Sequence, residues 1–174
     1  MREHRVFRIR TVLAIALIAV LALAGEVSAA DEACESTAKD DGNGWTLLFN
    51  KEDLSGWKTR GDASWKVEDG LLKGRQGPDG ADGDLLTEQE YTDFELVVEW
   101  KMHWPGNSGV WFRYQSPKTA YQADILEYKD PECYSGTLYC PGKMFLAMNE
   151  EKDIENKDGW NTFKIRCEGD HTVI

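Results

Sequence analysis

Two neighbouring segments, Gly109–Tyr114 and Tyr121–Glu127, carry the residues whose types and spacing could do chemistry, because apolar residues alternate in them with other kinds. Alternate side chains of a β-strand point to opposite faces of the sheet. The apolar positions, which would face a core, are Val110, Phe112, Tyr114, Tyr121, Ala123 and Ile125. The opposite face would then display Trp111, Arg113, Gln122 and Asp124.

An aromatic plane surrounded by amide and charged groups is typical of a sugar-binding surface, because the apolar face of a sugar ring stacks on an indole. The polar groups around it would form hydrogen bonds with the sugar hydroxyls. The same residues would also fit an ordinary solvated sheet face, with an Arg–Asp pair worth under about 1 kcal/mol. The residues alone leave both interpretations open.

The run from Gln122 to Glu127 has the spacing of the Glu-x-Asp-x-x-Glu strand in laminarinase-like retaining glucanases. Retaining hydrolysis needs a carboxylate nucleophile and a carboxylic acid about 5 Å apart. Gln122 occupies the first position, and an amide cannot serve as that nucleophile. The sequence therefore disfavours ordinary retaining hydrolysis.

The elements that must position these residues are strands. Phe94–Met102 alternates over nine residues with one apolar face, which predicts a half-buried strand. Asp69-Gly70 between Ser64–Glu68 and Leu71–Gly74 predicts a hairpin with a tight turn. Asn161–Glu168 is a later strand, and no segment has a useful helical period. We expect an all-β protein, a concanavalin-A-like antiparallel β-sandwich or jelly roll.

The composition fits one folded domain. The chain has 174 residues, of which 41% are hydrophobic and 11% aromatic, including seven Trp, so it can build a core. Asp and Glu number 31 against 20 Lys and Arg, a net charge of −11. A nucleic-acid-binding protein needs a basic surface to neutralise phosphates, so this balance argues against a nucleic-acid partner.

The first thirty residues read as a secretory signal peptide. Four Arg precede an apolar run, Val12 to Ala24, and small residues follow up to Ala30. The apolar run is short for a membrane span, which needs about 20 residues, so we expect cleavage after Ala29 or Ala30 and export to the periplasm or the extracellular space. No later segment is apolar enough to hold the protein in a membrane after cleavage. Residues 31–43 would be a flexible lead-in, and 44–174 the domain.

Four cysteines in an exported chain suggest oxidation. Cys133 and Cys140 bracket a short segment and are candidates for a local disulfide. Cys34 could pair with Cys167 if the first and last strands are neighbours. A structural zinc site is disfavoured, because there is no Cys-x-x-Cys and the three His are scattered.

Several blocks in order resemble the 3-keto-disaccharide hydrolase domain family of the concanavalin-A-like lectin/glucanase superfamily. The resemblance begins at Gly44 and runs to the end of the chain. Its blocks are Gly44–Phe49 with Leu54–Trp57, Trp65–Gly70, Leu85–Thr87, Tyr91–Leu96, Glu99–Lys101, Gly106–Val110 with Arg113, Tyr121–Ile125, Gly136–Tyr139 and Gly159–Asn161. Many members carry Glu where Gln122 stands and Asp where Glu127 stands.

The resemblance implies a sandwich that cleaves glycosides already oxidised at C3 of the sugar. The ketone acidifies the hydrogen on C2, so a base can remove it and the C1 substituent is expelled by β-elimination; water addition completes a net hydrolysis. Such a site needs a general base and a group that holds the enolate oxygen. The resemblance implies Asp124 or Glu127 as the base, and Arg113 or a bound divalent cation as the enolate stabiliser. It implies that Gln122, Trp111, Asn107 and Tyr139 position the carbohydrate substrate.

Alternatives stay open. Asn107 could instead only shape the turn before its strand. The same fold could be a non-catalytic carbohydrate-binding module, or a conventional endoglucanase, which Gln122 disfavours. The family pattern would continue beyond Thr172-Val173-Ile174, so we expect a C-terminally truncated sandwich with unpaired sheet edges.

Overall fold

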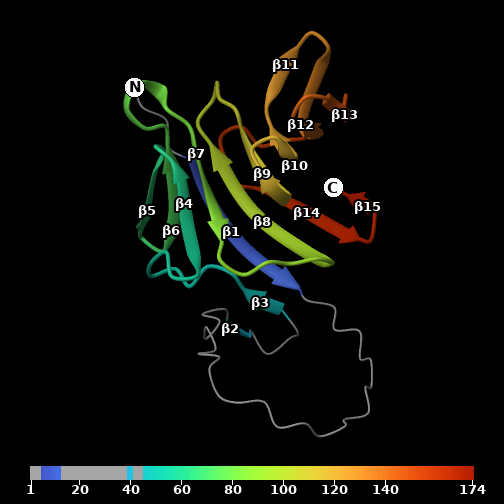
Figure 1. Ribbon diagram of the computed structural model, residues 1–174. Coiled ribbons are helices and arrows are strands. Elements are labelled where there is room, and N and C mark those ends of the chain that lie inside the picture. The colour runs from blue at the N-terminus through green and yellow to red at the C-terminus, as the bar shows by residue number, and fades with distance from the viewer. Residues whose placement is uncertain (1–4, 13–38, 41–44) are drawn as a thin grey trace, which may run out of the picture.

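The computed structural model describes residues 5–12, 39–40 and 45–174 and consists of antiparallel strands in three sheets (Figure 1). No α-helix occurs among the described residues, whose one helical element is the short 3₁₀ turn η1 (Pro78–Gly80). The strands curl around a shared core, as in a jelly roll. The expected all-β sandwich is therefore confirmed.

The eight-stranded sheet is built around β8, the strand with the clearest alternation. β8 buries Phe94, Val98, Trp100 and Met102 on one face. The order of this sheet is β15 (His171–Val173), β14 (Asn161–Glu168), β8 (Phe94–Met102), β1 (Arg5–Val12), β3 (Trp45–Leu47) and β2 (Lys39–Asp40), with β6 (Leu71–Arg75) joining β1 to β5 (Ser64–Glu68). The predicted hairpin is β5–β6, and both turn residues, Asp69 and Gly70, have the positive φ that a tight primed turn requires.

The five-stranded sheet packs across this one and carries the candidate chemistry. Its strands are β9 (Ser108–Ser116), β10 (Thr119–Ile125), β11 (Glu127–Lys129), β12 (Glu132–Cys140) and β13 (Met144–Asn149). β10 and β11 pair with β12 in one register, as Gln122 opposite Tyr139 and Glu127 opposite Tyr134 show. They therefore form one long hairpin, whose tip rises above the rest of the molecule in Figure 1.

A separate two-stranded sheet, β4 (Trp57–Gly61) with β7 (Gly83–Thr87), lies at the β9 side of the five-stranded sheet. The contact that brings the two sheets together is a hydrogen bond from the Tyr114 hydroxyl of β9 to Asp84 of β7. This small sheet therefore flanks the edge of the five-stranded sheet.

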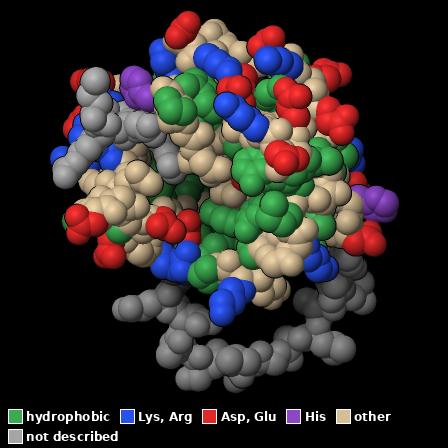
Figure 2. All heavy atoms as spheres, turned by 90° about the horizontal axis from the view of Figure 1, so that it is seen from above, with side chains coloured by type: hydrophobic (Ala, Val, Ile, Leu, Met, Phe, Trp, Pro, Cys, Tyr) green, Lys and Arg blue, Asp and Glu red, His purple; other side chains and the backbone are tan. Residues whose placement is uncertain are grey.

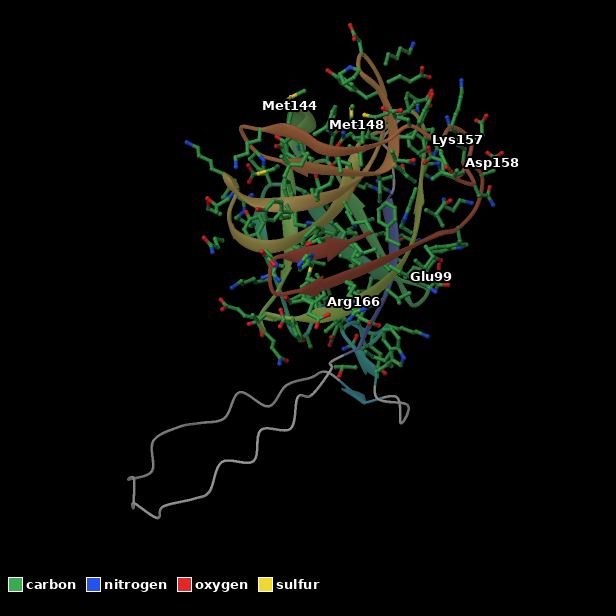
Figure 3. The ribbon with its side chains drawn as sticks, turned by 90° about the vertical axis from the view of Figure 1, so that its right-hand side faces the viewer. Glu99, Met144, Met148, Lys157, Asp158 and Arg166 are labelled. Atoms are coloured by element: carbon green, nitrogen blue, oxygen red, sulfur yellow. The ribbon has the colours of Figure 1, made fainter. Side chains whose placement is uncertain are left out.

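The core lies between the two larger sheets. Val98 and Trp100 of β8 and Ile165 of β14 pack against Phe112, Ala123 and Ile125 of the five-stranded sheet. At the outer edge of the five-stranded sheet, β13 exposes Met144, Leu146 and Met148; Figure 3 labels the two methionines and shows them on the outside. One face of β9 and β10 is thus used for folding, which leaves the other face for a ligand.

The amino-terminal region enters the fold through one strand. Arg5–Val12, which the signal-peptide prediction places at its start, form β1 and pair with β8 along their whole length. The rest of the predicted signal peptide and Cys34 lie outside the described residues, so cleavage stays a prediction. Within the described part of the chain, no helix has the length and apolar character to cross a membrane.

Candidate active site

Trp111, Gln122 and Tyr139 stand side by side on three neighbouring strands. Gln122 of β10 is opposite Trp111 of β9 and opposite Tyr139 of β12. The rings of Trp111 and Tyr139 are 6.1 Å apart between centroids, in an edge-on arrangement. The prediction that Trp111 and Gln122 share the face away from the core is confirmed, and Tyr139 joins them.

The aromatic surface continues along the sheet beyond Tyr139. Phe145 of β13 lies 6.4 Å from Tyr139 and 5.5 Å from Tyr128 of β11, measured between ring centroids. Edge-to-face pairs of this kind hold their rings in fixed orientations. Tyr128 and Phe145 cannot be recognised in the sequence as part of this surface, because only the pairing of β12 with β11 and with β13 brings them to it.

The polar groups of this surface are not used within the protein. In residues 45–174, the side chains of Gln122 and Asn107, the Tyr139 hydroxyl and the Trp111 indole N–H make no hydrogen bond to another described residue. All four residues are partly or fully accessible rather than buried. They are therefore free to bind the hydroxyl and carbonyl groups of a ligand.

Gly109 provides the space in which the Gln122 side chain lies. A Cβ atom built on Gly109 would be 2.5 Å from Gln122 Cγ and 2.7 Å from Nε2, closer than real contacts allow. The Gln122 carboxamide thus lies over Gly109, which is itself the residue opposite Asp124. Glycine permits this close approach, since a Cβ atom here would oblige the flexible Gln122 side chain to move, and no unusual backbone conformation is involved.

Asp124 is a buried carboxyl group without a partner. Asp124 is only 3% exposed, and its carboxyl group forms no hydrogen bond or ion pair with residues 45–174. Burial raises the pKa of Asp124 to about 7, because the charged form loses its hydration and nothing replaces it. A carboxyl group that titrates near neutral pH is suited to accept and return a proton.

Asp124 lies at the place where the hairpin bends. Leu126 leaves the strand there, its N–H donates to Ser135 Oγ at 3.1 Å, and Gly136 has φ of 95°. The buried Cys133 thiol lies near this bend, and burial, with a contribution from the Asp124 charge, raises its pKa. The bend thus surrounds Asp124 with groups that carry no positive charge.

Glu127, the other predicted base, is in a different environment. It is exposed and forms an ion pair with Lys157. Hydrogen bonding to Lys157 and the charge of that ammonium lower the pKa of Glu127. The structure does not bring Glu127 to Asp124, and the lowered pKa makes Glu127 a weak base.

Arg113 departs from the predicted pattern. Phe112 of β9 is opposite Tyr121 of β10, and Ser116 is opposite Thr119. The two strands therefore span the same stretch in four residue steps along β9 and two along β10, and Arg113 in this stretch has φ of 49°. This bulge breaks the alternation. The guanidinium donates to the carbonyl of Gly169, in the turn between β14 and β15, and lies 3.6 Å from Asp93, the residue before β8.

The prediction that Arg113 shares a face with Trp111 and Gln122 is therefore wrong, and so is the prediction that Tyr114 faces the core. The bulge turns Tyr114 to the side of Trp111, where the two ring centroids are 6.1 Å apart. A bulge adds residues to one strand only, so it shows itself in the pairing and not in the hydrophobic pattern.

The predicted Cys133–Cys140 disulfide is also wrong, because both thiols are free. The two cysteines are the second and last residues of β12 rather than the ends of a loop. A strand rises about 3.3 Å per residue, which keeps them far beyond disulfide distance. Cys167 is free and buried, and its proposed partner lies outside the described residues.

The described part of the chain shows no cluster of acidic, thiol or imidazole side chains for a divalent cation. Among the described residues, no group of three or more His, Cys, Asp or Glu side chains is arranged to hold a metal ion. Divalent cations are held by several such groups at once. No step of the chemistry below is therefore assigned to a metal.

A hollow of about 1650 Å³ lies beside this surface. Figure 2, seen from above, shows the surface hollowed next to an apolar area. Its lining includes Asn107, Gly109, Trp111, Tyr114 and Gln122. Asp124 is not part of the lining, whereas Gly109, the residue opposite it, and Gln122 are.

Comparisons with known proteins show which family the chain belongs to. The profile of a family described as the 3-keto-alpha-glucoside-1,2-lyase-like domain matches residues 44–174. A 3-keto-disaccharide hydrolase from Bacteroides thetaiotaomicron is 34% identical over 98 residues, which cover 50% of this chain and 34% of that relative. The match thus spans about a third of the relative's length. No solved structure matched the chain.

Proposed function

Because the chain belongs to the 3-keto-alpha-glucoside-1,2-lyase-like domain family, we propose that it cleaves glycosides whose sugar ring carries a ketone at C3. The observation that carries the proposal is Asp124, a buried carboxyl group with no partner and a pKa of about 7. Next to it, Trp111, Gln122 and Tyr139 form a surface with unused hydrogen-bonding groups. A general base and a sugar-binding surface are what the reaction needs.

The reaction begins at C2, next to the ketone. The ionised Asp124 carboxylate removes the C2 proton, and the electron pair of that C–H bond forms an enolate with its negative charge on the C3 oxygen. The enolate then expels the C1 substituent, so that a C1=C2 double bond forms and the ketone is restored. The departing oxygen takes the proton back from Asp124 and leaves as an alcohol. Addition of water across C1=C2 gives net hydrolysis.

The other residues hold the substrate and its developing charge. The sugar ring stacks on Trp111, and the Gln122 carboxamide and Tyr139 hydroxyl donate hydrogen bonds to the C3 oxygen as it becomes an enolate. Asn107, at the turn before β9, binds a ring hydroxyl. The Gln122 side chain must shift from its place over Gly109 to bring the substrate to Asp124, because Asp124 does not line the hollow.

The test is cleavage of 3-keto-disaccharides by the full-length chain. We expect Asp124→Asn to lower kcat by at least about 100-fold, the usual contribution of a general base. Glu127→Gln is the matched carboxylate control, since Glu127 is exposed and paired with Lys157, and its kcat should stay within about threefold of wild type. Equal activity in wild type and Asp124→Asn would refute the assignment of the base.

A non-catalytic carbohydrate-binding module is the second candidate. It is favoured by the row of aromatic rings and by the covered position of Asp124. This candidate predicts saturable binding of disaccharides that Trp111→Ala abolishes, with no product from any keto-sugar. Release of the alcohol from a 3-keto-glycoside would exclude it.

We further propose that the protein acts outside the cytoplasm, on the basis of the signal-peptide pattern in residues 1–30. Mass spectrometry of the protein recovered from an exporting bacterial host would detect an N-terminus at residue 30 or 31. Recovery of the uncut chain from the cytoplasm alone would contradict export.

A further inference from the structure

A second polar group borders Trp111, on the side away from Asp124. Arg60 of β4 donates from Nε to Asp84 Oδ2 at 3.1 Å and donates from Nη2 to the same oxygen. The Tyr114 hydroxyl donates to that oxygen at 3.3 Å. The Arg60 guanidinium also lies 5.5 Å from the centroid of the Tyr114 ring. Three strands from two sheets therefore meet in one cluster: Arg60, Asp84 and Tyr114.

The backbone of β9 is bent to place Tyr114 in this cluster. Regular alternation would turn Tyr114 toward the core, but the bulge at Arg113 brings its ring to 6.1 Å from Trp111. Arg113 has a positive φ, a conformation that costs free energy in any residue with a Cβ atom. Backbone strain of this kind is concentrated at functional sites. The strain at Arg113 therefore indicates that the placement of Tyr114 serves ligand binding.

The cluster is accessible and has unused acceptor capacity. Arg60, Asp84 and Tyr114 line the same hollow as Trp111 and Gln122. All hydrogen bonds to the Asp84 carboxylate from described residues go to Oδ2, which leaves Oδ1 available. The cluster therefore offers an acceptor oxygen, guanidinium N–H groups and an aromatic ring within a small area.

The charge of the cluster indicates what kind of ligand it fits. Asp84 neutralises Arg60, so the cluster has no net charge with which to attract an anion or a cation. Adjacent donors and acceptors beside an aromatic ring match neighbouring hydroxyl groups on a neutral ring. A polyhydroxylated ligand fits these groups better than an ionic or a purely apolar one.

We propose that Arg60, Asp84 and Tyr114 form a subsite for the sugar that leaves when the glycosidic bond is cut. This inference rests on the proposed function and deepens it: the preferred substrate is a disaccharide, whose second ring lies between Trp111 and Asp84. A glycoside with a small alkyl group in place of the second sugar does not reach this subsite. Arg60, Asp84 and Tyr114 are thus specificity-determining rather than catalytic residues.

The experiment compares two substrate lengths. The full-length chain and its Asp84→Asn variant are assayed with the 3-keto derivatives of maltose, cellobiose and trehalose, and with methyl 3-keto-glucosides. We expect Asp84→Asn to lower kcat/KM for the preferred disaccharide about tenfold, mainly by raising KM. This loss should be at least fivefold larger than the loss of kcat/KM for the methyl glycoside. Tyr114→Phe, which keeps the ring, should act in the same direction. Glu68→Gln removes another ion-paired carboxylate, one that is more exposed than Asp84 and lies outside the lining of the hollow, and serves as the control.

The outcomes separate a subsite from a structural role. A purely structural cluster would reduce turnover of both substrate lengths equally, and that result, or no effect of Asp84→Asn, would overturn the proposal. If the wild-type protein cleaves no keto-sugar, the proposed function is refuted. A binding measurement then tests whether the subsite exists. Titration of Trp fluorescence with maltose, cellobiose and trehalose against methyl glucosides should then show tighter binding of a disaccharide, a preference that Asp84→Asn removes. Equal affinity for both lengths in wild type would overturn the subsite as well.

Discussion

The difference between Asp124 and Glu127 shows how surroundings decide the chemistry of a carboxyl group. Both follow one another along the same hairpin, and both are candidate bases by sequence. Burial without a partner raises the pKa of Asp124 to about 7, whereas an exposed ion pair with Lys157 lowers that of Glu127. An ionised carboxylate with a higher pKa takes a proton from carbon more readily. The residue to alter first is therefore Asp124.

The raised pKa of Asp124 predicts how stability depends on pH. The unfolded chain loses this proton near the ordinary value of 3.8, and the folded protein near 7. Between these values the folded state binds more protons than the unfolded chain. The contribution of the Asp124 proton to the free energy of unfolding is therefore full below about pH 4 and is lost as pH rises to about 7. The change is a few kcal/mol, at about 1.4 kcal/mol per pH unit of the window.

Urea unfolding of wild type and Asp124→Asn at pH values from 4 to 8 would measure this change. As pH rises to about 7, the unfolding free energy of the wild type should fall relative to that of the variant. Above pH 7 the difference between the two proteins should stay constant. A difference that does not change with pH would show that Asp124 titrates normally in the folded protein.

Arg113 offers a second prediction at this scale. Its contacts with Asp93 and the Gly169 carbonyl join β9 to the ends of strands of the eight-stranded sheet, although Arg113 also lines the hollow. We expect Arg113→Ala to lower the unfolding free energy by about 1 kcal/mol, while kcat/KM of the folded protein falls less than threefold. A large loss of kcat at unchanged stability would instead place Arg113 in the chemistry.

Among the elements, the neighbouring strands β12, β10 and β9 of the five-stranded sheet carry the proposed binding surface, with β9 at the edge of the sheet. Their register sets Trp111 and Tyr139 on either side of Gln122. The missing side chain of Gly109 lets the Gln122 carboxamide lie between β9 and β10. The position of Gln122 is therefore a property of two paired strands and not of one residue.

Gly109→Ala tests this arrangement. The backbone of Gly109 suits alanine, because no positive φ is needed there, but the new methyl group would displace Gln122. We expect KM to rise about tenfold, roughly 1.4 kcal/mol of lost binding, with the fold retained. Adding Gln122→Ala to this variant should cost little more than either change alone, because both act on one side chain. Additive losses in the double variant would separate the two residues.

At the scale of the whole molecule, β1 and the predicted signal peptide make competing demands on the same residues. Arg5–Val12 fill the position between β8 and β6, whereas cleavage after residue 29 or 30 would remove them. The exported form would then leave backbone donors and acceptors of β8 and β6 without their partner. Unpaired strand edges of this kind invite another strand.

A comparison of the full chain with residues 31–174 tests the contribution of β1. We expect the shorter protein to unfold at a lower urea concentration and to associate more readily, as judged by light scattering at matched concentrations. Equal midpoints and equal solubility would show that the fold does not depend on β1.

Charged residues cover part of the surface away from the proposed site. The loop before β14 and the outer face of the eight-stranded sheet carry charged residues such as Lys157, Asp158, Glu99 and Arg166, which Figure 3 labels. Arg166 is paired with Glu168 and lies near Glu95 on that face. Ion pairs at exposed positions contribute little to stability, and this face is well solvated.

The sheet class, the hairpin at Asp69-Gly70 and the placement of Trp111 and Gln122 on the face away from the core could all be predicted from the order of the residues. These features are local, since each depends on the order of apolar residues and on turn chemistry over a few positions. The sequence also placed Asp124 among the candidate bases. A pattern of this range cannot show which strand lies next to which.

The position of Tyr139 beside Trp111, the bulge that puts Tyr114 rather than Arg113 on the side of Trp111, and the separation of Cys133 from Cys140 along one strand become visible only in the folded chain. The different surroundings of Asp124 and Glu127 become visible there too. The reason is that register, bulges and burial depend on groups brought together from distant parts of the chain. The pKa of a carboxyl group depends on those neighbours and on its access to water, and neither can be predicted from the residues next to it in the sequence.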